Sequence, residues 1–454
     1  MPDPADSDQF RFDSVMTQPD TIFALSSGAG RAGIAVVRVS GPDAAAAFSL
    51  FQSGQPPARM ARVADLRSRG GDLIDQALLL WFPAPHSATG ENVAELHVHG
   101  SPVIVEQLLR ELASVPAFSL AEPGEFTRRA FLNGRMDLLQ VEGLADALAA
   151  ETPGQLRLAM RQFLGEASGQ YEAWRSSALR ALALLEAAID FSDEGDVGEG
   201  AAADAGAEIA RLAASLREGL AMAGRAAAVR RGVRVVIAGP ANAGKSSLLN
   251  WLVGREAAIV SAVAGTTRDV VEAPLLIAGQ AVSISDTAGF RDSSGDAIED
   301  EGMRRSTLAA QDADILVWVQ AVGSPIVAPP RSPDLLVISK SDLYGEDSLK
   351  RGDGALRISV LACQGLDEFR SQLESLIRSR NELPEHAVVV QERHRAAVEQ
   401  CLLWLDRAAQ LDGARLELAA DDMRRAAQAL SGVTGKMGSE DVLGAIFGEF
   451  CIGK

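Results

Sequence analysis

The chain is poor in cysteine: its 454 residues contain only Cys363, Cys401 and Cys451. These three are far apart and odd in number, so a reducing compartment is indicated and no disulfide framework is expected. No apolar run approaches the roughly 20 residues that span a bilayer. Residues 1–18 are acidic and polar, unlike a signal peptide. We therefore expect a cytoplasmic protein, without a membrane segment, that begins with a disordered leader at 1–18.

An excess of positive charge is also missing, since the formal net charge is −18. Such a surface repels nucleic acid and anionic membranes as a whole, so any RNA contact requires a local basic patch or a partner. Hydrophobic residues make up 47% and charged residues 23%, which are ordinary values for globular proteins. The length suggests two to four domains.

The most informative stretch is V-R-V-V-I-A-G-P-A-N-A-G-K-S-S at 233–247. A β-branched apolar run stops at Gly239, and Gly-x-x-x-x-Gly-Lys-Ser follows and opens into helix-forming residues. This order is typical of a phosphate-binding loop, in which backbone N–H groups and a helix N-terminus surround the phosphates. Lys245 is predicted to reach the β- and γ-phosphates and Ser246 to bind Mg²⁺. A chance match in a chain rich in glycine and alanine is the alternative.

Four downstream segments favour a guanine nucleotide. Gly-Thr-Thr-Arg-Asp at 265–269 can supply a second Mg²⁺ ligand, Thr267, and Asp-Thr-Ala-Gly at 286–289 follows a strand. Ser-Lys-Ser-Asp at 339–342 follows another strand and is predicted to read guanine through Asp342. Residues 359–361 are predicted to close on the base. Each segment alone is weak, but four in this order are a strong signal.

Two departures from common GTPases shape the prediction. Ser339 stands where Asn is usual, so we expect weaker bracing of the P-loop and weaker nucleotide affinity with guanine preference kept. Phe290 stands where Ras-like enzymes have a water-orienting Gln. Asn242 and the loop at 261–266 offer oxygen atoms for K⁺, which could neutralise charge in the transition state. Glu299 is the candidate for orienting water; a solvated acid at a helix start is the alternative.

The remaining sequence suggests how the domains are ordered. Strand-like runs at 21–25, 33–41, 77–82 and 92–100 alternate with helix-like stretches at 42–51 and 102–114. This predicts an α+β domain over 19–135.

From 136 to 230 the chain is helical in character, with capping signals at Asp137–Gln140 and Thr152–Pro153. An α/β domain at 231–380 interrupts this helical region, and a helical pattern of residues resumes over 381–454. We expect the α/β domain to be inserted between two halves of an all-α domain.

Several blocks identify the chain as resembling the MnmE (TrmE) family of tRNA modification GTPases. They are DTIFAL to GRAGIAVVRVSGP (20–42), the EL-H-HG stretch (95–100) and GEFTRRAFLNGRMDLLQVEGLADAL (124–148). Further blocks are AAIDF, GPANAGKSSLLN, REAAIVSAVAGTTRDV, DTAGFR and the terminal IFGEFCIGK (446–454). The resemblance spans nearly the whole chain.

The resemblance implies a multidomain fold: an α+β N-terminal folate-binding domain, a discontinuous all-α helical domain and an inserted Ras-like α/β G domain. It implies a homodimer joined through the N-terminal domains, whose G domains meet when K⁺ and GTP are bound. It also implies a heterotetramer with the FAD- and NADH-using flavoprotein MnmG (GidA). Together they would add a carboxymethylaminomethyl or aminomethyl group to C5 of the wobble uridine of certain tRNAs. The one-carbon unit would come from a tetrahydrofolate, as the 5,10-methylene or 5-formyl form.

The resemblance also implies site residues. K⁺ would be held by Asn242, Ser261, Val263 and Thr266, and Mg²⁺ by Ser246 and Thr267. Glu299 would be catalytic, and Cys451 could act as acid, base or nucleophile beside a one-carbon carrier, although a small buried residue is the simpler reading. The folate contacts would be Arg38, Glu95, Arg135 and Lys454; from their chemistry alone, each is more simply a surface ion pair. The predicted GTP contacts are Asn242, Ala243, Gly244, Lys245, Ser246, Ser247, Ser261, Ala262, Val263, Ala264, Gly265, Thr266, Thr267, Asp286, Thr287, Ala288, Gly289, Ser339, Lys340, Asp342, Ser359, Val360 and Leu361.

Two functions therefore stand side by side. One is a K⁺-dependent GTPase activated by dimerisation and coupled to tRNA modification. The other is a GTP-driven molecular switch in ribosome or ribonucleoprotein assembly, with no one-carbon chemistry. The N-terminal block and the C-terminal CIGK favour the first, because a pure switch needs neither. Given the charge of −18, we expect tRNA to be bound largely through the flavoprotein partner.

Overall fold

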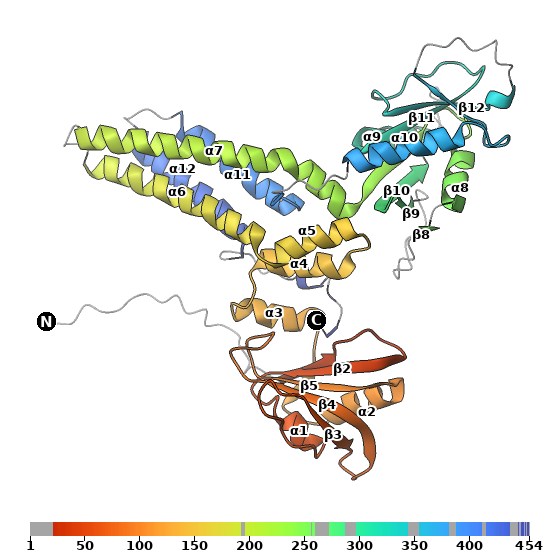
Figure 1. Cartoon of the computed structure of the whole chain (residues 1–454). Coiled ribbons are helices and arrows are strands. Elements are labelled where there is room, and N and C mark those ends of the chain that lie inside the picture. The colour runs from red at the N-terminus through yellow and green to blue at the C-terminus, as the bar shows by residue number, and fades with distance from the viewer. Residues whose placement is uncertain are drawn as a thin grey trace. The chain divides into compact units, whose positions relative to one another are not determined.

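The computed structural model describes residues 21–191, 196–255, 257–258, 272–286, 297–343, 354–380, 387–410, 415–435, 444, 446–448, 450 and 452–453. These residues fall into two compact units (Figure 1). The first contains the described residues up to Val141 and those from Gly444 onward. The second contains those from Glu142 to Gly435.

The first unit is built on a six-stranded sheet with the order β3-β4-β5-β2-β1-β6. Only the pairing of β1 with β6 is parallel; the other neighbours are antiparallel. The strands are β1 (Thr21–Leu25), β2 (Ala32–Ser40), β3 (Arg62–Arg67), β4 (Leu73–Phe82), β5 (Val93–Gly100) and β6 (Phe118–Leu120). Its helices are α1 (Ala46–Leu50), α2 (Pro102–Ala113) and α3 (Glu125–Leu132). The predicted strands and both predicted helices are confirmed.

Apolar and polar side chains alternate along β5, so the sheet carries polar groups on the face opposite its core. Ala94, Leu96 and Val98 point into a core shared with α1 and α2, where Phe48, Leu108 and Leu112 are fully buried. Successive side chains of a strand point to opposite faces, so Glu95, His97 and His99 lie on the other face. On β2 the same rule places Arg38 opposite the core-facing Val37 and Val39. Arg38 and Glu95 are direct neighbours across the strands.

The C-terminal residues return to this first unit. Ile452 forms an isolated antiparallel bridge with Pro123. Gly453 has a φ of +96°, and a Cβ atom there would lie 2.0 Å from the carbonyl oxygen of Leu25. Any other residue would collide with the backbone at the end of β1, so this close approach requires glycine.

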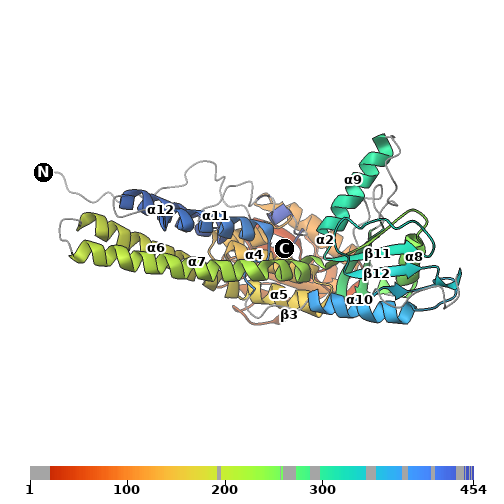
Figure 2. The ribbon, with the colours of Figure 1, turned by 90° about the horizontal axis from the view of Figure 1, so that it is seen from above.

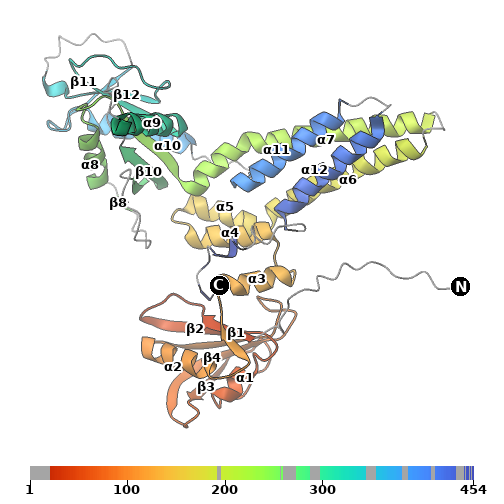
Figure 3. The same ribbon diagram turned by 180° about the vertical axis from the view of Figure 1, so that it is seen from behind.

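The helical part of the second unit combines chain segments that precede and follow an α/β region at 232–380. It contains α4 (Leu138–Ala149), whose first turn belongs to the first unit, and α5 (Pro153–Phe163), α6 (Glu166–Asp190), α7 (Asp196–Arg231), α11 (Glu392–Ala408) and α12 (Leu416–Val433). α6 packs against α7 and α12, and α11 packs against α7 and α12. The view from above and the view from behind both show these four helices lying together (Figures 2 and 3).

Both predicted capping signals are confirmed. Asp137 and Gln140 exchange side-chain and backbone hydrogen bonds of 2.9 and 3.0 Å at the start of α4. At the start of α5, Thr152 and Gln155 form a capping box with Pro153 in the first turn. Each cap satisfies N–H groups that lack partners within the helix, which is why these residue types start helices.

A buried polar cluster joins the two halves of the helical region. Glu142 of α4 accepts from His394 Nε2 of α11 at 2.8 Å and from Arg393 Nε. Arg393 Nη1 also donates to the carbonyl oxygen of Val433 at the end of α12, at 3.0 Å. His394 Nδ1 accepts the backbone N–H of Gln391 at 3.3 Å, which identifies its other nitrogen as the donor to Glu142.

The α/β region, which the resemblance identifies as the expected G domain, has a seven-stranded sheet with the order β13-β12-β11-β7-β10-β9-β8. Neighbouring strands from β13 to β10 pair in parallel. β9 pairs in the antiparallel sense with both of its neighbours, β10 and β8. They are β7 (Val233–Ala238), β8 (Ala257–Ala258), β9 (Glu272–Ile277), β10 (Gln280–Asp286), β11 (Ile315–Ala321), β12 (Leu335–Ser339) and β13 (Leu356–Arg357). The helices are α8 (Lys245–Arg255), α9 (Ala297–Asp312) and α10 (Leu366–Arg380), with a 3₁₀ turn η1 (Ser341–Leu343).

Candidate functional site

The predicted P-loop connects β7 to α8. Gly239 has a φ of +148°, and a Cβ atom there would lie 1.9 Å from the carbonyl oxygen of Val319, so only glycine fits. Asn242 also has a positive φ, +59°, which is unusual for a residue other than glycine. α8 begins at Lys245, so its N-terminal N–H groups face the loop. This arrangement is a ready anion site.

The side chains of this loop are held by oxygen atoms of their neighbours. Lys245 Nζ donates to the carbonyl oxygen of Pro240 at 3.0 Å, and its burial lowers the pKa of the ammonium group, an effect that the charge of Asp286 partly offsets. Ser246 Oγ donates to Asp286 Oδ2 at 2.5 Å. β10 runs parallel to β7 with Asp286 opposite Ile237, so the sheet brings these groups together.

The surroundings of Asp286 indicate whether this site suits Mg²⁺. Its Oδ1 atom is buried and has no hydrogen-bond partner among the described residues. A buried carboxylate oxygen without a partner is costly unless a cation or water satisfies it. Oxygen donors from a hydroxyl and a carboxylate are those that Mg²⁺ prefers. Ser246 and Asp286 therefore fit the ion, while Thr267 lies outside the described residues.

The predicted base-reading segment follows β12. Ser339 is only 4% exposed, and its Oγ donates to the P-loop carbonyl of Ala243 at 2.5 Å. Lys340 has a φ of +57°, and Asp342 is exposed on η1. Ser339 therefore contacts the P-loop directly, even though its side chain is shorter than that of Asn.

The predicted closing segment follows β13. Ser359 is buried and its Oγ accepts the N–H of Ala362 at 3.0 Å, whereas Leu361 is 90% exposed. β7, β10, β12 and β13 are all parallel, so the P-loop, Asp286 and both guanine segments lie at the same edge of the sheet. Ligands of open α/β sheets bind at this carboxyl edge. The structure thus brings these predicted residues together.

Several predicted site residues, or their side chains, lie outside the part of the chain that the structure describes. Glu299 lies in the first turn of α9, and its side chain is not among the described atoms. The segments 261–267 and 287–289, together with Cys451 and Lys454, lie outside the described residues. Of the four predicted K⁺ ligands only Asn242 is described.

In the first unit, Arg38 and Glu95 form a paired site. Arg38 Nη2 lies 2.9 Å from Glu95 Oε1, and its guanidinium group lies over the ring of Phe126, 5.7 Å from the centroid. His97 Nε2 lies 3.1 Å from Glu95 Oε2. Burial raises the pKa of Glu95, but hydrogen bonds and charges from His97 and Arg38 outweigh burial and hold the pKa below its usual value. Arg135 is exposed in the turn after α3.

Within the described residues, no group of three or more His, Cys, Asp or Glu side chains could hold a metal ion. His97 contacts Glu95, and His99 instead contacts Asp75 at 2.8 Å. In the same residues no helix has the length and apolar character to cross a bilayer.

Known families cover nearly the whole chain. The MnmE helical domain matches residues 138–451, and the GTP-binding protein TrmE N-terminus matches residues 21–135. The tRNA modification GTPase MnmE of Azorhizobium caulinodans is 47% identical over 440 residues, 96% of this chain and 99% of the relative. That of Parvibaculum lavamentivorans is 46% identical over 448 residues, 96% and 100% of the two chains.

The chain belongs to the MnmE family. This membership confirms the predicted family, the multidomain fold class and the assignment as a GTP hydrolase of the tRNA modification class. A solved structure, the G domain of the T. maritima FeoB iron transporter, is 20% identical and covers 32% of this chain and 98% of its own, with a TM-score of 0.24. That score is too low to support an argument about this MnmE-family protein.

Some residues that the structure brings together carry no local signal in the sequence. Glu142 and His394 are 252 positions apart, and Asp314 and Arg231 are 83 apart. Asp286 was predicted as part of its motif, but its contact with Ser246 depends on the register between β10 and β7. The order of β10, β7 and β11 decides the contacts of Asp286 and Asp314, whereas the contact between Glu142 and His394 depends on how α4 and α11 lie together.

Proposed function

We propose that this chain is a K⁺-dependent, dimerisation-activated GTPase that works with the flavoprotein MnmG (GidA). Together they add a carboxymethylaminomethyl or aminomethyl group to C5 of the wobble uridine, U34, of certain tRNAs. A 5,10-methylene- or 5-formyl-tetrahydrofolate supplies the one-carbon unit. The observation that carries the proposal is that one chain combines the Ser246–Asp286 site at the P-loop with the Arg38–Glu95 pair, and that the C-terminal residues return to the unit that contains this pair.

GTP turnover would use the carboxyl edge of the G-domain sheet. Backbone N–H groups of the P-loop and the start of α8 bind the phosphates, and Lys245 compensates their charge. Ser246 and Thr267 would bind Mg²⁺, with Asp286 holding the ion through water, and the ion would supply charge stabilisation. Asn242 would contribute one ligand to K⁺, with Ser261, Val263 and Thr266 as the others. Glu299 would orient the attacking water from the first turn of α9, and Asp342 would accept the guanine N–H donors.

The folate carrier would bind in the N-terminal unit. A carboxylate that stays ionised can accept hydrogen bonds from the adjacent N–H groups of a pterin ring, which suits Glu95. Arg38 and Arg135 would bind negatively charged groups of the carrier, with Arg135 exposed for this role. Lys454 and Cys451 would approach from the C-terminal segment, since Ile452 and Gly453 lie against Pro123 and Leu25.

The proposed assembly is cytoplasmic. Two chains would join through their N-terminal units, and two MnmG subunits would complete a heterotetramer. The net charge of −18 argues that tRNA contacts come largely from the partner, because phosphate contacts need positive charge. The domain boundaries 19–135, 136–230, 231–380 and 381–454 remain part of the proposal.

Nucleoside mass spectrometry of tRNA tests the proposed function. A strain without this gene should lack the C5-modified U34, and the intact gene should restore it. The gene with Glu95→Gln, which removes the proposed pterin-binding charge, should restore it poorly. Normal U34 modification in the deletion strain would contradict the proposal.

The alternative, a GTP-driven switch in ribosome or ribonucleoprotein assembly, makes a different prediction about folate. Equilibrium dialysis of the intact protein with 5-formyl-tetrahydrofolate should show binding that Glu95→Gln weakens. No binding would favour the switch, because the Arg38–Glu95 pair would then be a structural ion pair.

A further inference from the structure

Two aspartates lie at the amino edge of the G-domain sheet, opposite the P-loop. Asp314 directly precedes β11; its Oδ2 accepts the N–H of Arg234 at 2.8 Å, and its Oδ1 lies 2.9 Å from Arg231 Nη2. Arg231 is the last residue of α7, where the chain enters the G domain. Asp314 therefore ties the entry of the chain to the start of β11.

The second aspartate makes the corresponding contact at the exit. Asp334 directly precedes β12, and its Oδ1 lies 3.0 Å from Arg380 Nη2. Arg380 is the last residue of α10, after which the chain leaves the G domain. Asp334 Oδ2 accepts the N–H of Leu316 in β11 at 2.8 Å, and Asp314 directly precedes that strand, so both aspartates lie at its start.

Arg331 connects this pair of contacts to the C-terminal end of α9. Its Nε donates to the carbonyl oxygen of Ala310 and its Nη2 to that of Ala313, both at 3.0 Å. Its Nη2 also lies 3.1 Å from Asp334 Oδ2. Cations that bind the last carbonyl groups of a helix stabilise that end. α9 is thus fixed to the exit contact at one end and carries Glu299 at the other.

We propose that Asp314, Asp334 and Arg331, here called the collar, transmit the nucleotide state of the G domain to both of its connections with the helical region. α9 has 16 residues, so it spans roughly 24 Å at 1.5 Å per residue. A helix is rigid over that length, and a shift of its first turn during GTP turnover would move its last turn. The collar would pass this shift to Arg231 and Arg380 together.

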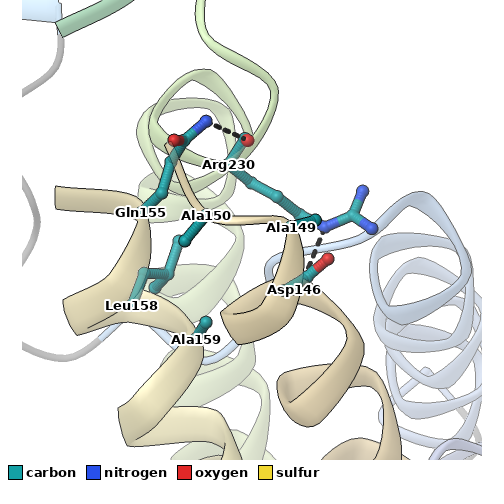
Figure 4. A pocket seen from close by; sticks show the side chains of 7 residues that line it. All are labelled: Asp146, Ala149, Ala150, Gln155, Leu158, Ala159 and Arg230. Atoms are coloured by element: carbon teal, nitrogen blue, oxygen red, sulfur yellow. Dashed lines mark hydrogen bonds and ion pairs between the residues drawn. The ribbon is translucent and has the colours of Figure 1, made fainter. Parts of the chain in front are cut away.

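The residue before Arg231 extends this connection into the helical region. Arg230 Nε lies 2.7 Å from Asp146 Oδ2 in α4, and its carbonyl oxygen accepts from Gln155 Nε2 in α5 at 3.0 Å (Figure 4). These residues line a cavity of about 230 Å³ whose other walls are mostly alanine. Two consecutive arginines therefore contact opposite partners, Asp314 in the G domain and Asp146 in α4. A change at the collar would reach α4 and α5 through this step.

Hydrogen exchange of the full-length protein tests the collar. The wild type is compared with GDP and with a non-hydrolysable GTP analogue, and exchange is followed in α4, α5 and the last turns of α7. We expect the two nucleotides to give rates that differ by about five-fold or more, the lower end of ordinary allosteric coupling. Asp314→Asn with Asp334→Asn should remove most of that difference, while nucleotide affinity stays within about two-fold, because neither residue lies at the carboxyl edge.

Two variants separate coupling from simple destabilisation. Asp367→Asn removes a partner of Arg255 in the same domain, outside the collar, and should leave the nucleotide-dependent difference intact. Arg231→Asp combined with Asp314→Arg reverses one ion pair and should retain part of the difference that the double aspartate substitution removes. Wild-type exchange that does not depend on the nucleotide, or collar variants that keep the full difference, would overturn the proposal.

The inference rests on the proposed function only in that GTP turnover acts on the rest of the chain. If U34 modification requires this gene and the wild type shows no nucleotide dependence, the collar alone is wrong. If exchange is coupled and U34 modification does not require the gene, only the proposed function fails.

Discussion

Replacing Glu142 by Ala should strongly destabilise the helical region. Glu142 is 3% exposed and His394 is completely buried, and the carboxylate accepts hydrogen bonds from both His394 and Arg393. Removing it leaves the buried Nε2–H of His394 and the guanidinium of Arg393 without their acceptor. Breaking a buried pair by removing one partner costs about 3–5 kcal/mol, and we expect the lower end because Arg393 is partly exposed.

The assay is denaturant and thermal unfolding, followed by far-ultraviolet circular dichroism. A loss of about 3 kcal/mol corresponds to a fall in Tm of about 6–12 °C for a domain of this size. Glu142→Gln should cost less, because the amide oxygen can still accept from His394 while its NH₂ group faces Arg393. The matched control is Asp406→Ala, which breaks the exposed pair with Arg217 and should cost about 1 kcal/mol or less. Equal losses for Glu142→Ala and Asp406→Ala would refute the reasoning.

The same cluster predicts how stability depends on pH. Burial lowers the pKa of His394 below its ordinary 6.5, despite the opposing effect of Glu142. Burial raises the pKa of Glu142, but His394 and Arg393 outweigh it and hold the pKa below 4.5. In both cases the unfolded chain binds protons first, so stability is fully present above 6.5 and falls as pH decreases, first through His394 and then below 4.5 through Glu142. In His394→Gln, unfolding measured from pH 8 to pH 5 should lose most of the decrease below 6.5; an unchanged profile would assign that decrease elsewhere.

Three further predictions concern the G domain. Ser339→Ala should weaken binding of GTP and GDP by about ten-fold each, because one buried hydrogen bond to the P-loop is lost; titration with 7-deaza-GTP should show the same loss, whereas a smaller loss for that analogue would mean that Ser339 also reads the base. Asp342→Asn should shift preference from GTP toward XTP, since the amide can donate where the carboxylate accepts; unchanged preference would assign base reading elsewhere. GTP turnover should be several-fold faster in K⁺ than in Na⁺ if Asn242 belongs to a cage for the larger ion, and equal rates in the two salts would contradict that cage.

The phosphate-binding site could be predicted because its signals are local. Gly239, Lys245 and Ser246 lie within eight consecutive residues, and a strand and a helix flank them. The capping boxes at Asp137 and Thr152 are local in the same sense, since each depends on a residue three positions away. A local backbone conformation needs only neighbouring residues, so these features are visible in a single sequence.

The contact of Ser339 with the P-loop depends on more than its neighbours in the sequence. From side-chain length, Ser should brace the P-loop less well than Asn. In the structure its hydroxyl lies 2.5 Å from the carbonyl oxygen of Ala243. The reach of a side chain depends on how closely β12 approaches the P-loop, which is set by packing of the whole sheet. The glycine at 244 leaves room beside the hydroxyl, since even an added Cβ would stay 3.7 Å away.

The ion pairs around Glu142 and those at the collar differ in burial, and this difference suits different tasks. Glu142 is 3% exposed, so breaking its contacts costs several kcal/mol and the two halves of the helical region stay joined. At the collar, the side chains of Asp334 and Arg380 are 13% and 51% exposed. Partly exposed pairs are worth about 1 kcal/mol or less each, so they can exchange partners during a turnover cycle. Several such pairs acting together reach the 1–3 kcal/mol of typical coupling without fixing the G domain in one position. If the nucleotide state of an inserted domain is to act on the rest of the chain, the helical region must be rigid and the ion pairs at its connections must be able to change partners.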